Sequence, residues 1–237
     1  MKRLFFALLC LTALNFRAAV AAEMPSEGGI PPVAEVPSLS AASSSFSALP
    51  SDRSAVRDSV VACAGRTQTM ECRFVQTRHL DMLDEDIVSK GTMAFCQPDK
   101  LRWEYTEPYV YRFVLNGGRI LLQSEERSDV VDVNASDMFQ AIADIILNSM
   151  TGNILLDTKN FAQEFRASGR EYTAVLQPVS GQLKDFFQQI DIVFDAGSYQ
   201  VIRVVLSEES GDTTTVVLSR ESTGRALDAA LFAIPSK

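Results

Sequence analysis

Short segments in which apolar and polar residues alternate recur through most of this chain. Residues 99–108 (DKLRWEYTEP) place Leu101, Trp103 and Tyr105 at alternate positions. Successive side chains of a β-strand point to opposite faces, so this alternation predicts a strand with one apolar face. The segments that read as strands are 69–80, 87–97, 101–106, 109–115, 119–123, 160–167, 171–177, 189–195, 200–207 and 213–219. Glycine turns such as NGG at 116–118 join them and favour antiparallel neighbours over βαβ units.

Two other segments have helical spacing. Residues 52–66 predict an amphipathic helix whose apolar side carries Val56, Val60, Cys63 and Ala64. Residues 136–153 are apolar around more than half of a helix, which therefore needs apolar neighbours on more than one side. We expect an α+β fold, mainly antiparallel β, in which about 9–11 strands form a sheet that curls strongly or partly closes.

The N-terminal region has two parts. Lys2 and Arg3, an apolar run at 4–14 and small residues up to Ala22 have the layout of a secretory signal, so we expect residues 1–22 to be cleaved. Residues 23–50 hold five of the nine prolines and a serine-rich stretch, which predicts a flexible tether. Residues 51–237 then form a single domain, long enough for a substantial core.

The charge balance and the rare residue types limit the function. The formal net charge is −8, and cleavage after residue 22 removes three basic residues and no acidic ones, which argues against nucleic acid as a partner. The single histidine, His79, leaves one route to a Ser-His-Asp or Cys-His site, so a hydrolase using His79 is a minor alternative. We expect no enzyme activity, no cofactor and no metal.

Two acidic clusters read as solvated segments. The first, at 81–86, predicts a hairpin tip centred near Asp84 rather than a calcium site, because its spacing lacks the ligand pattern of a calcium loop. The second, at 125–132, predicts a charged loop, with a docking patch for a basic partner as the alternative. A tip at Asp84 would let Cys72 face Cys96 in a disulfide, while Cys63 with Cys72 is the rival pairing.

The apolar faces of several strands need a partner. Large apolar residues share one parity in three strands: Leu101, Trp103 and Tyr105; Tyr109, Tyr111 and Phe113; Ile190, Ile192 and Phe194. In one curved sheet, these side chains line a concave face. Two interpretations stay open: the helices fill this face as an ordinary core, or they cover it in part and leave an apolar pocket for a ligand.

Several motifs follow one another in a specific order: Phe74-x-Gln76, Gly91 opening a strand that runs to Pro98, Leu101-Arg102-Trp103-x-Tyr105-x-x-Pro108, Val114-x-Asn116-Gly117, and a final Leu227, Phe232, Ile234 and Pro235. This order resembles that of the LolA-like periplasmic carriers of outer-membrane lipoproteins. The resemblance covers most of residues 51–237, and its most specific stretch is 91–118.

The resemblance implies a half-open β-barrel of about eleven strands with an apolar concave face and helices that act as a lid, to which 137–150 would belong. It implies a monomeric, non-enzymatic carrier of lipoprotein acyl chains in the periplasm. The implied partners are an inner-membrane ATP-driven release complex and an outer-membrane acceptor. A glycolipid-binding or free-lipid-binding module on the same fold is the alternative.

One position departs from the family pattern. Such carriers often have an arginine just before the first proline of the motif, where it helps hold the lid shut, whereas this chain has Gln97. We therefore do not assign the arginine's role here. The residues expected to line the apolar cavity are Phe74, Phe95, Leu101, Trp103, Tyr105, Tyr111, Phe113, Ile142 and Ile146.

Overall fold

The computed structural model divides the chain into two units, residues 1–45 and 46–237. It describes residues 47–48, 53–83, 85–135, 143, 147–180, 182–185 and 187–235, all in the second unit. The predicted signal peptide, most of the predicted tether, and the predicted site residues Ile142 and Ile146 lie outside the described residues. Of the predicted helix 136–153, the structure describes Ala143 and residues 147–150 as helical.

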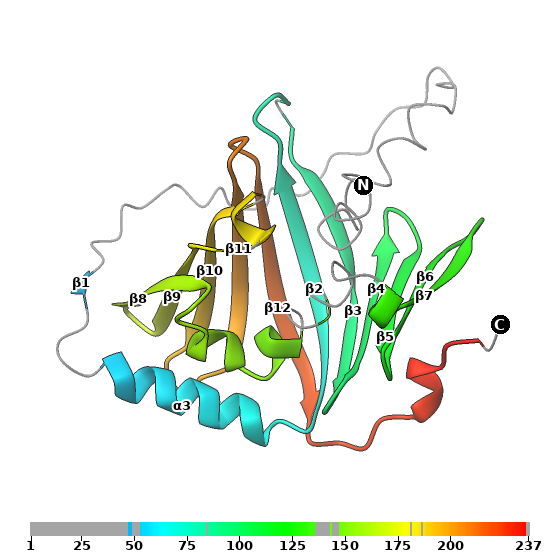
Figure 1. Ribbon diagram of the computed structural model, residues 1–237, viewed down its shortest axis with the longest axis horizontal. Helices are drawn as coiled ribbons and strands as arrows, with labels where there is room; N and C mark the ends of the chain where they lie inside the picture. Colours follow the sequence, from blue (N-terminus) through cyan, green and yellow to red (C-terminus); the bar gives the residue numbers. More distant parts are fainter. Residues whose placement is uncertain are drawn as a thin grey trace, which may run out of the picture. The chain divides into compact units, whose positions relative to one another are not determined.

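The second unit is built on one large antiparallel sheet (Figure 1). Its strands are β1 (Ser47–Ala48), β2 (Thr69–His79), β3 (Ile87–Cys96), β4 (Lys100–Glu107), β5 (Tyr111–Asn116), β6 (Arg119–Ser124), β7 (Ser128–Asp132), β8 (Phe161–Ser168), β9 (Glu171–Pro178), β10 (Phe187–Asp195), β11 (Val201–Glu208) and β12 (Thr213–Thr223). The spatial order is β1-β8-β9-β10-β11-β12-β2-β3-β4-β5-β6-β7. Two meanders, β2–β7 and β8–β12, are therefore joined where β12 pairs with β2.

In the described part of the chain, the helices are few and short. Helix α3 covers Arg53–Arg66, and four 3₁₀ turns follow: η1 (Val133–Ala135), η2 (Asn153–Leu156), η3 (Gln182–Asp185) and η4 (Ala229–Phe232). Among the described residues, no helix is both long and apolar enough to cross a membrane. The predicted architecture, a curved and unclosed antiparallel sheet with short helices, is confirmed.

Strand β7 was not anticipated from the sequence. Its five residues fall in the acidic stretch that predicts a charged loop, and only Val130 and Val131 are apolar. The strand lies at one edge of the sheet, where it pairs with β6 alone. An edge strand can carry charges on both faces, so it lacks the alternation that identifies a half-buried strand. The other predicted strands agree within two residues at each end, except that β12 continues to Thr223.

Neither disulfide considered from the sequence forms, because Cys63, Cys72 and Cys96 are all free thiols. The register of β2 and β3 pairs Cys72 with Met93 and Cys96 with Thr69. The hairpin is therefore centred between Met82 and Leu83 rather than at Asp84, and Cys72 and Cys96 point to opposite faces of the sheet. The Cys63 Sγ instead lies 3.3 Å from the carbonyl oxygen of Ser198.

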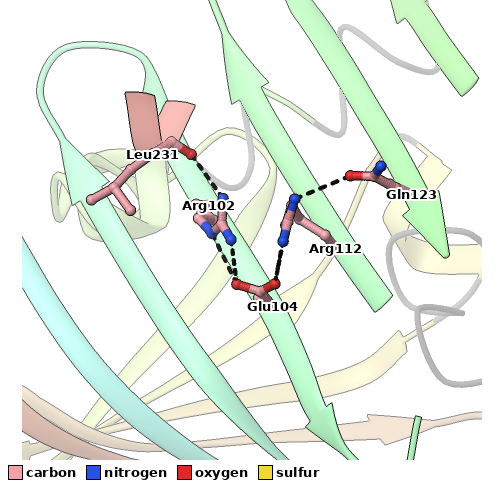
Figure 2. Close-up of polar contacts among 5 residues, drawn as sticks. All are labelled: Arg102, Glu104, Arg112, Gln123 and Leu231. Atoms are coloured by element: carbon pink, nitrogen blue, oxygen red, sulfur yellow. Dashed lines mark hydrogen bonds and ion pairs between the residues drawn. The ribbon is translucent and has the colours of Figure 1, made fainter. Parts of the chain in front are cut away.

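The C-terminal segment covers one face of strands β3–β6. Phe232 and Ile234 pack there against Ala94, Val114 and Leu121. Two side chains hold the segment by its backbone. Arg102 Nη1 donates to the Leu231 carbonyl at 3.2 Å (Figure 2). Asn116 Nδ2 donates to the Phe232 carbonyl at 2.8 Å. The closing Phe-x-Ile-Pro motif is thus a structural cap on this face, which we call the capped face.

Glu104 ties the same region together (Figure 2). Its carboxylate accepts hydrogen bonds from Arg102 Nε at 3.0 Å and from Arg112 Nη2 at 2.6 Å, so it joins β4 to β5. Burial acts to raise the pKa of Glu104, but the hydrogen bonds and charges of Arg112 and Arg102 outweigh it and hold the pKa below its ordinary value. The ionised carboxylate therefore stabilises the folded chain.

We expect Glu104→Gln to lower the free energy of unfolding by about 1 kcal/mol at neutral pH, because it removes a charged acceptor shared by two arginines. Since the folded pKa is depressed, the contribution of Glu104 is present above the unfolded pKa and is lost as the pH falls through the folded pKa. Urea unfolding from pH 7 to pH 3 should show the two proteins converging. A constant difference across that range would contradict the ionic role.

A second prediction concerns Gly91, where β3 passes very close to its neighbours. A Cβ at this position would lie 2.0 Å from the Glu104 carbonyl oxygen and 2.5 Å from the Phe74 ring. Gly91→Ala must therefore shift backbone, and we expect it to lower the free energy of unfolding by about 3 kcal/mol. Gly65→Ala in α3, where nothing lies within 4 Å of the new methyl, is the matched control and should be neutral or stabilising. Equal effects of the two substitutions in thermal unfolding would refute this account.

Candidate ligand-binding face

The strand register brings all seven described cavity residues predicted from the sequence to one face, opposite to the capped face. We call it the aromatic face. One cross-strand row contains Phe74, Gly91, Tyr105 and Tyr111. A second contains Cys72, Met93, Trp103 and Phe113, and a third contains Met70, Phe95, Leu101 and Leu115. The alternation read from single strands therefore continues across four strands as one surface.

Aromatic rings pack directly on one another at the centre of this face. The Phe74 and Trp103 rings stack with centroids 4.3 Å apart, and Tyr105 meets Phe74 edge to face at 5.2 Å. Gly91 has no side chain where the Phe74 ring lies, so the glycine that opens the family motif makes room for the central aromatic residue. Such contacts fix the ring orientations and give a rigid apolar platform.

Six of the seven residues are buried, and Trp103 is half-buried. Phe74, Phe95 and Phe113 are almost fully buried. Burial raises the pKa of Tyr111 to about 12 and raises that of Tyr105 as well, so both rings stay neutral over the whole physiological range. The face is therefore uncharged at its centre.

Beyond Phe74, the aromatic face becomes polar toward the β2–β3 hairpin. Gln76 accepts a hydrogen bond from the Tyr105 hydroxyl at 2.9 Å. Next on the same parity, Arg78 Nη2 lies 3.4 Å from a Glu208 carboxylate oxygen and 3.8 Å from one of Asp212. This polar strip, which consists of Gln76 and Arg78, is not among the features predicted from the sequence. Both residues follow Phe74 at alternate positions of β2, so the alternation could have placed them on the same face.

Helix α3 is fastened at its C-terminus by Gln97. Gln97 Nε2 lies 3.3, 3.4 and 3.1 Å from the carbonyl oxygens of Ala64, Gly65 and Thr67. The last carbonyls of a helix have no partner within the helix, and here a neutral amide supplies the donor. On its other side the helix packs against Gly152, where an added Cβ would lie 3.0 Å from the Ala64 Cβ. Figure 1 shows α3 running across the β8–β12 half of the sheet.

The structure gives His79 a simple role. His79 Nδ1 lies 2.9 Å from an Asp86 carboxylate oxygen across the β2–β3 hairpin, and both side chains are about half exposed. His79 has the parity of the capped face, so its ring points away from the aromatic residues. Within the described part of the chain, His, Cys, Asp and Glu side chains form no group of three that could hold a metal ion.

Gln97 provides a test of the helix contact. We expect Gln97→Ala to speed amide hydrogen exchange in the last turn of α3, because it removes the donor that satisfies the end carbonyls. Gln97→Glu should have a larger effect, since a carboxylate cannot donate and is repelled by the negative end of the helix dipole. Gln68→Ala is the control, because the Gln68 amide contacts only the Gln97 Oε1, at 3.4 Å. Unchanged exchange in both Gln97 variants would contradict the assignment.

The sequence of this chain is similar to those of known proteins. The family model described as outer membrane lipoprotein carrier protein LolA matches residues 65–235. Outer-membrane lipoprotein carrier proteins of Methylococcus capsulatus and Dechloromonas aromatica are 25% identical over 169 residues and 29% identical over 166 residues, each covering 70% of this chain and 76% of the relative. A LolA superfamily protein from Nitrosomonas europaea superposes with a TM-score of 0.45 at 8% identity, over 76% of this chain and 97% of that protein. Because the family model matches well over half of the sequence, the chain belongs to the LolA family of outer membrane lipoprotein carrier proteins.

Proposed function

We propose that this protein is a periplasmic carrier that binds the acyl chains of lipoproteins against its aromatic face and shuttles them from the inner to the outer membrane. The main observation in support of this proposal is that four neighbouring strands place seven large apolar residues on one face. Membership of the lipoprotein carrier family supports the choice of cargo. The protein acts by binding, and its chemistry requires no catalytic group.

The energetics of acyl transfer define which partners such a carrier needs. Burying a CH₂ group is worth about 0.8 kcal/mol, so one chain of roughly sixteen carbons gains on the order of 10 kcal/mol on leaving water. That gain keeps the cargo from escaping into the periplasm. A bilayer offers the same chain a similar gain, so apolar contact alone does not extract a lipoprotein from a membrane.

The carrier therefore works between two partners. An ATP-driven release complex in the inner membrane supplies the work of extraction, and an acceptor at the outer membrane binds the chains more tightly than the carrier does. The predicted signal at residues 1–22 supports export to the compartment between them. We propose that the carrier is monomeric and that the segment 137–150 belongs to a lid that covers the chains during transit.

The test uses inner-membrane vesicles that hold a labelled triacylated lipoprotein, the release complex and ATP, with the mature protein added outside. We expect label to appear in a soluble one-to-one complex. Trp103→Glu, at the half-buried centre of the aromatic face, should reduce this release at least tenfold, because it places a charge where acyl chains bind. Val75→Glu on the opposite face, where the side chain is 41% exposed, is the matched control and should release label normally.

Two outcomes would count against the proposal. If all label stays in the vesicles while the release complex hydrolyses ATP and the protein is folded, the cargo is not a lipoprotein, and free lipids or glycolipids become the ligands to test. If Trp103→Glu and Val75→Glu release label equally well, the aromatic face does not bind the chains.

A further inference from the structure

Arg220 Nε and Trp103 Nε1 are buried on the aromatic face and have no hydrogen-bond partner among the described residues. Arg78 on the same face differs from them, because its guanidinium contacts Glu208 and Asp212 through Nη2. Arg220 and Trp103 belong to one cross-strand row, which runs from Arg220 through Cys72 and Met93 to Trp103. Buried polar groups in folded proteins are nearly always paired, so each exception requires an explanation. Two exceptions in one row of a proposed binding surface point to a ligand that accepts hydrogen bonds.

Arg220 is also unusual in its charge environment. Other arginines on the sheet face carboxylates: Arg78 faces Glu208 and Asp212, and Arg102 and Arg112 share Glu104. Arg220 forms no ion pair within the described residues, although the chain has a formal net charge of −8. Its guanidinium interacts with the Cys72 thiol, where burial, the largest effect, raises the pKa of the thiol although the charge and the hydrogen bond of Arg220 act to lower it. The positive charge is therefore not neutralised by a carboxylate.

Trp103 supplies the second donor from β4. Its indole N–H lies near the Tyr105 hydroxyl and, as a weak donor, acts to lower the pKa of that group against the larger effect of burial. The contact does not have the geometry of a full hydrogen bond. The Tyr105 hydroxyl instead donates to Gln76. The neighbours of Trp103 in its row, Met93 and Phe113, are buried and apolar, so they offer the indole N–H no acceptor.

We propose that Arg220 and Trp103 bind the acceptor oxygens at the head of an acyl ligand, whose chain lies along the adjoining aromatic residues. The oxygens are those of a carboxylate or of an ester or amide carbonyl, which are the acceptors that acyl groups carry. A guanidinium binds either kind, and binds the charged one more strongly. This inference rests on the proposed function and adds to it a polar anchor, so that the face selects acyl compounds from other long-chain amphiphiles.

The test compares three probes of equal chain length by titration calorimetry: dodecanoate, methyl dodecanoate and dodecyltrimethylammonium. The first carries a carboxylate, the second a carbonyl, and the third a cation without an acceptor. We expect the wild-type protein to bind dodecanoate and its methyl ester at least tenfold more tightly than dodecyltrimethylammonium. A preference for dodecanoate over the ester would identify a carboxylate as the natural head, and similar affinities would identify a carbonyl.

The variants separate the anchor from the apolar face. Arg220→Met should weaken dodecanoate binding about tenfold, and Arg220→Lys, which keeps the charge, should retain most of it. Trp103→Phe keeps an aromatic ring but removes the N–H, and it should weaken binding of the methyl ester about fivefold. Arg73→Met is the matched control, since Arg73 lies on β2 with the opposite parity, is mostly exposed and pairs with Glu221. It should bind all three probes as the wild type does.

The outcomes distinguish this inference from the proposed function. If the wild type binds the three probes with equal affinity, and Arg220→Met and Trp103→Phe fold normally and bind as tightly as the wild type, the polar anchor is disproved while acyl binding stands. If the folded wild type binds none of the probes, the aromatic face does not bind single acyl chains, and both the anchor and the proposed function fail.

Discussion

The register between β2, β3 and β4 is the constraint on which the rest of this structure depends. Pairing Phe74 with Gly91, and Gly91 with Tyr105, sends every large aromatic residue of these strands to one face. A shift of the strand register by one residue would turn each aromatic side chain to the capped face. The residues of the capped face would then point to the aromatic face. Gly91 fixes the register sterically, since only a residue without a side chain fits between the Phe74 ring and the Glu104 carbonyl.

Both faces of the β3–β6 region are apolar, and this explains why the chain needs its C-terminal segment. Phe113 and Leu115 point to the aromatic face, whereas Val114 between them is fully buried under Phe232 and Ile234. The cap occupies the capped face, and the opposite, aromatic face is the one on which we propose that the ligand binds. Glu104 binds both arginines on this side of the sheet, and Arg102 also donates to the Leu231 carbonyl, so the polar cluster supports the cap.

The sequence predicts those features of the fold whose pattern lies within one strand, and it fails for features that depend on contacts between distant residues. The alternation of apolar and polar residues is visible within one strand. It therefore assigns Leu101, Trp103 and Tyr105 correctly to a single face without knowledge of the neighbouring strands. The Cys72–Cys96 pairing failed because it depended on where the hairpin turns, and a displacement of the turn reverses which residues face each other. Strand β7 was missed because an edge strand tolerates charges, and the Gln97 contact was missed because it joins residues 30 or more positions apart.

The polar groups on the aromatic face bear on how a carrier controls its cargo. An apolar surface alone binds any long chain in proportion to its length, and it offers no way to distinguish an acyl group from another amphiphile. Arg220 Nε and Trp103 Nε1, which are buried without full hydrogen bonds, cost the unliganded protein stability, and an acyl head that supplies the missing oxygens recovers it. Selectivity then comes from the penalty imposed on ligands that leave Arg220 and Trp103 unsatisfied. The chain length sets how tightly the cargo is held, whereas the head decides which cargo is accepted.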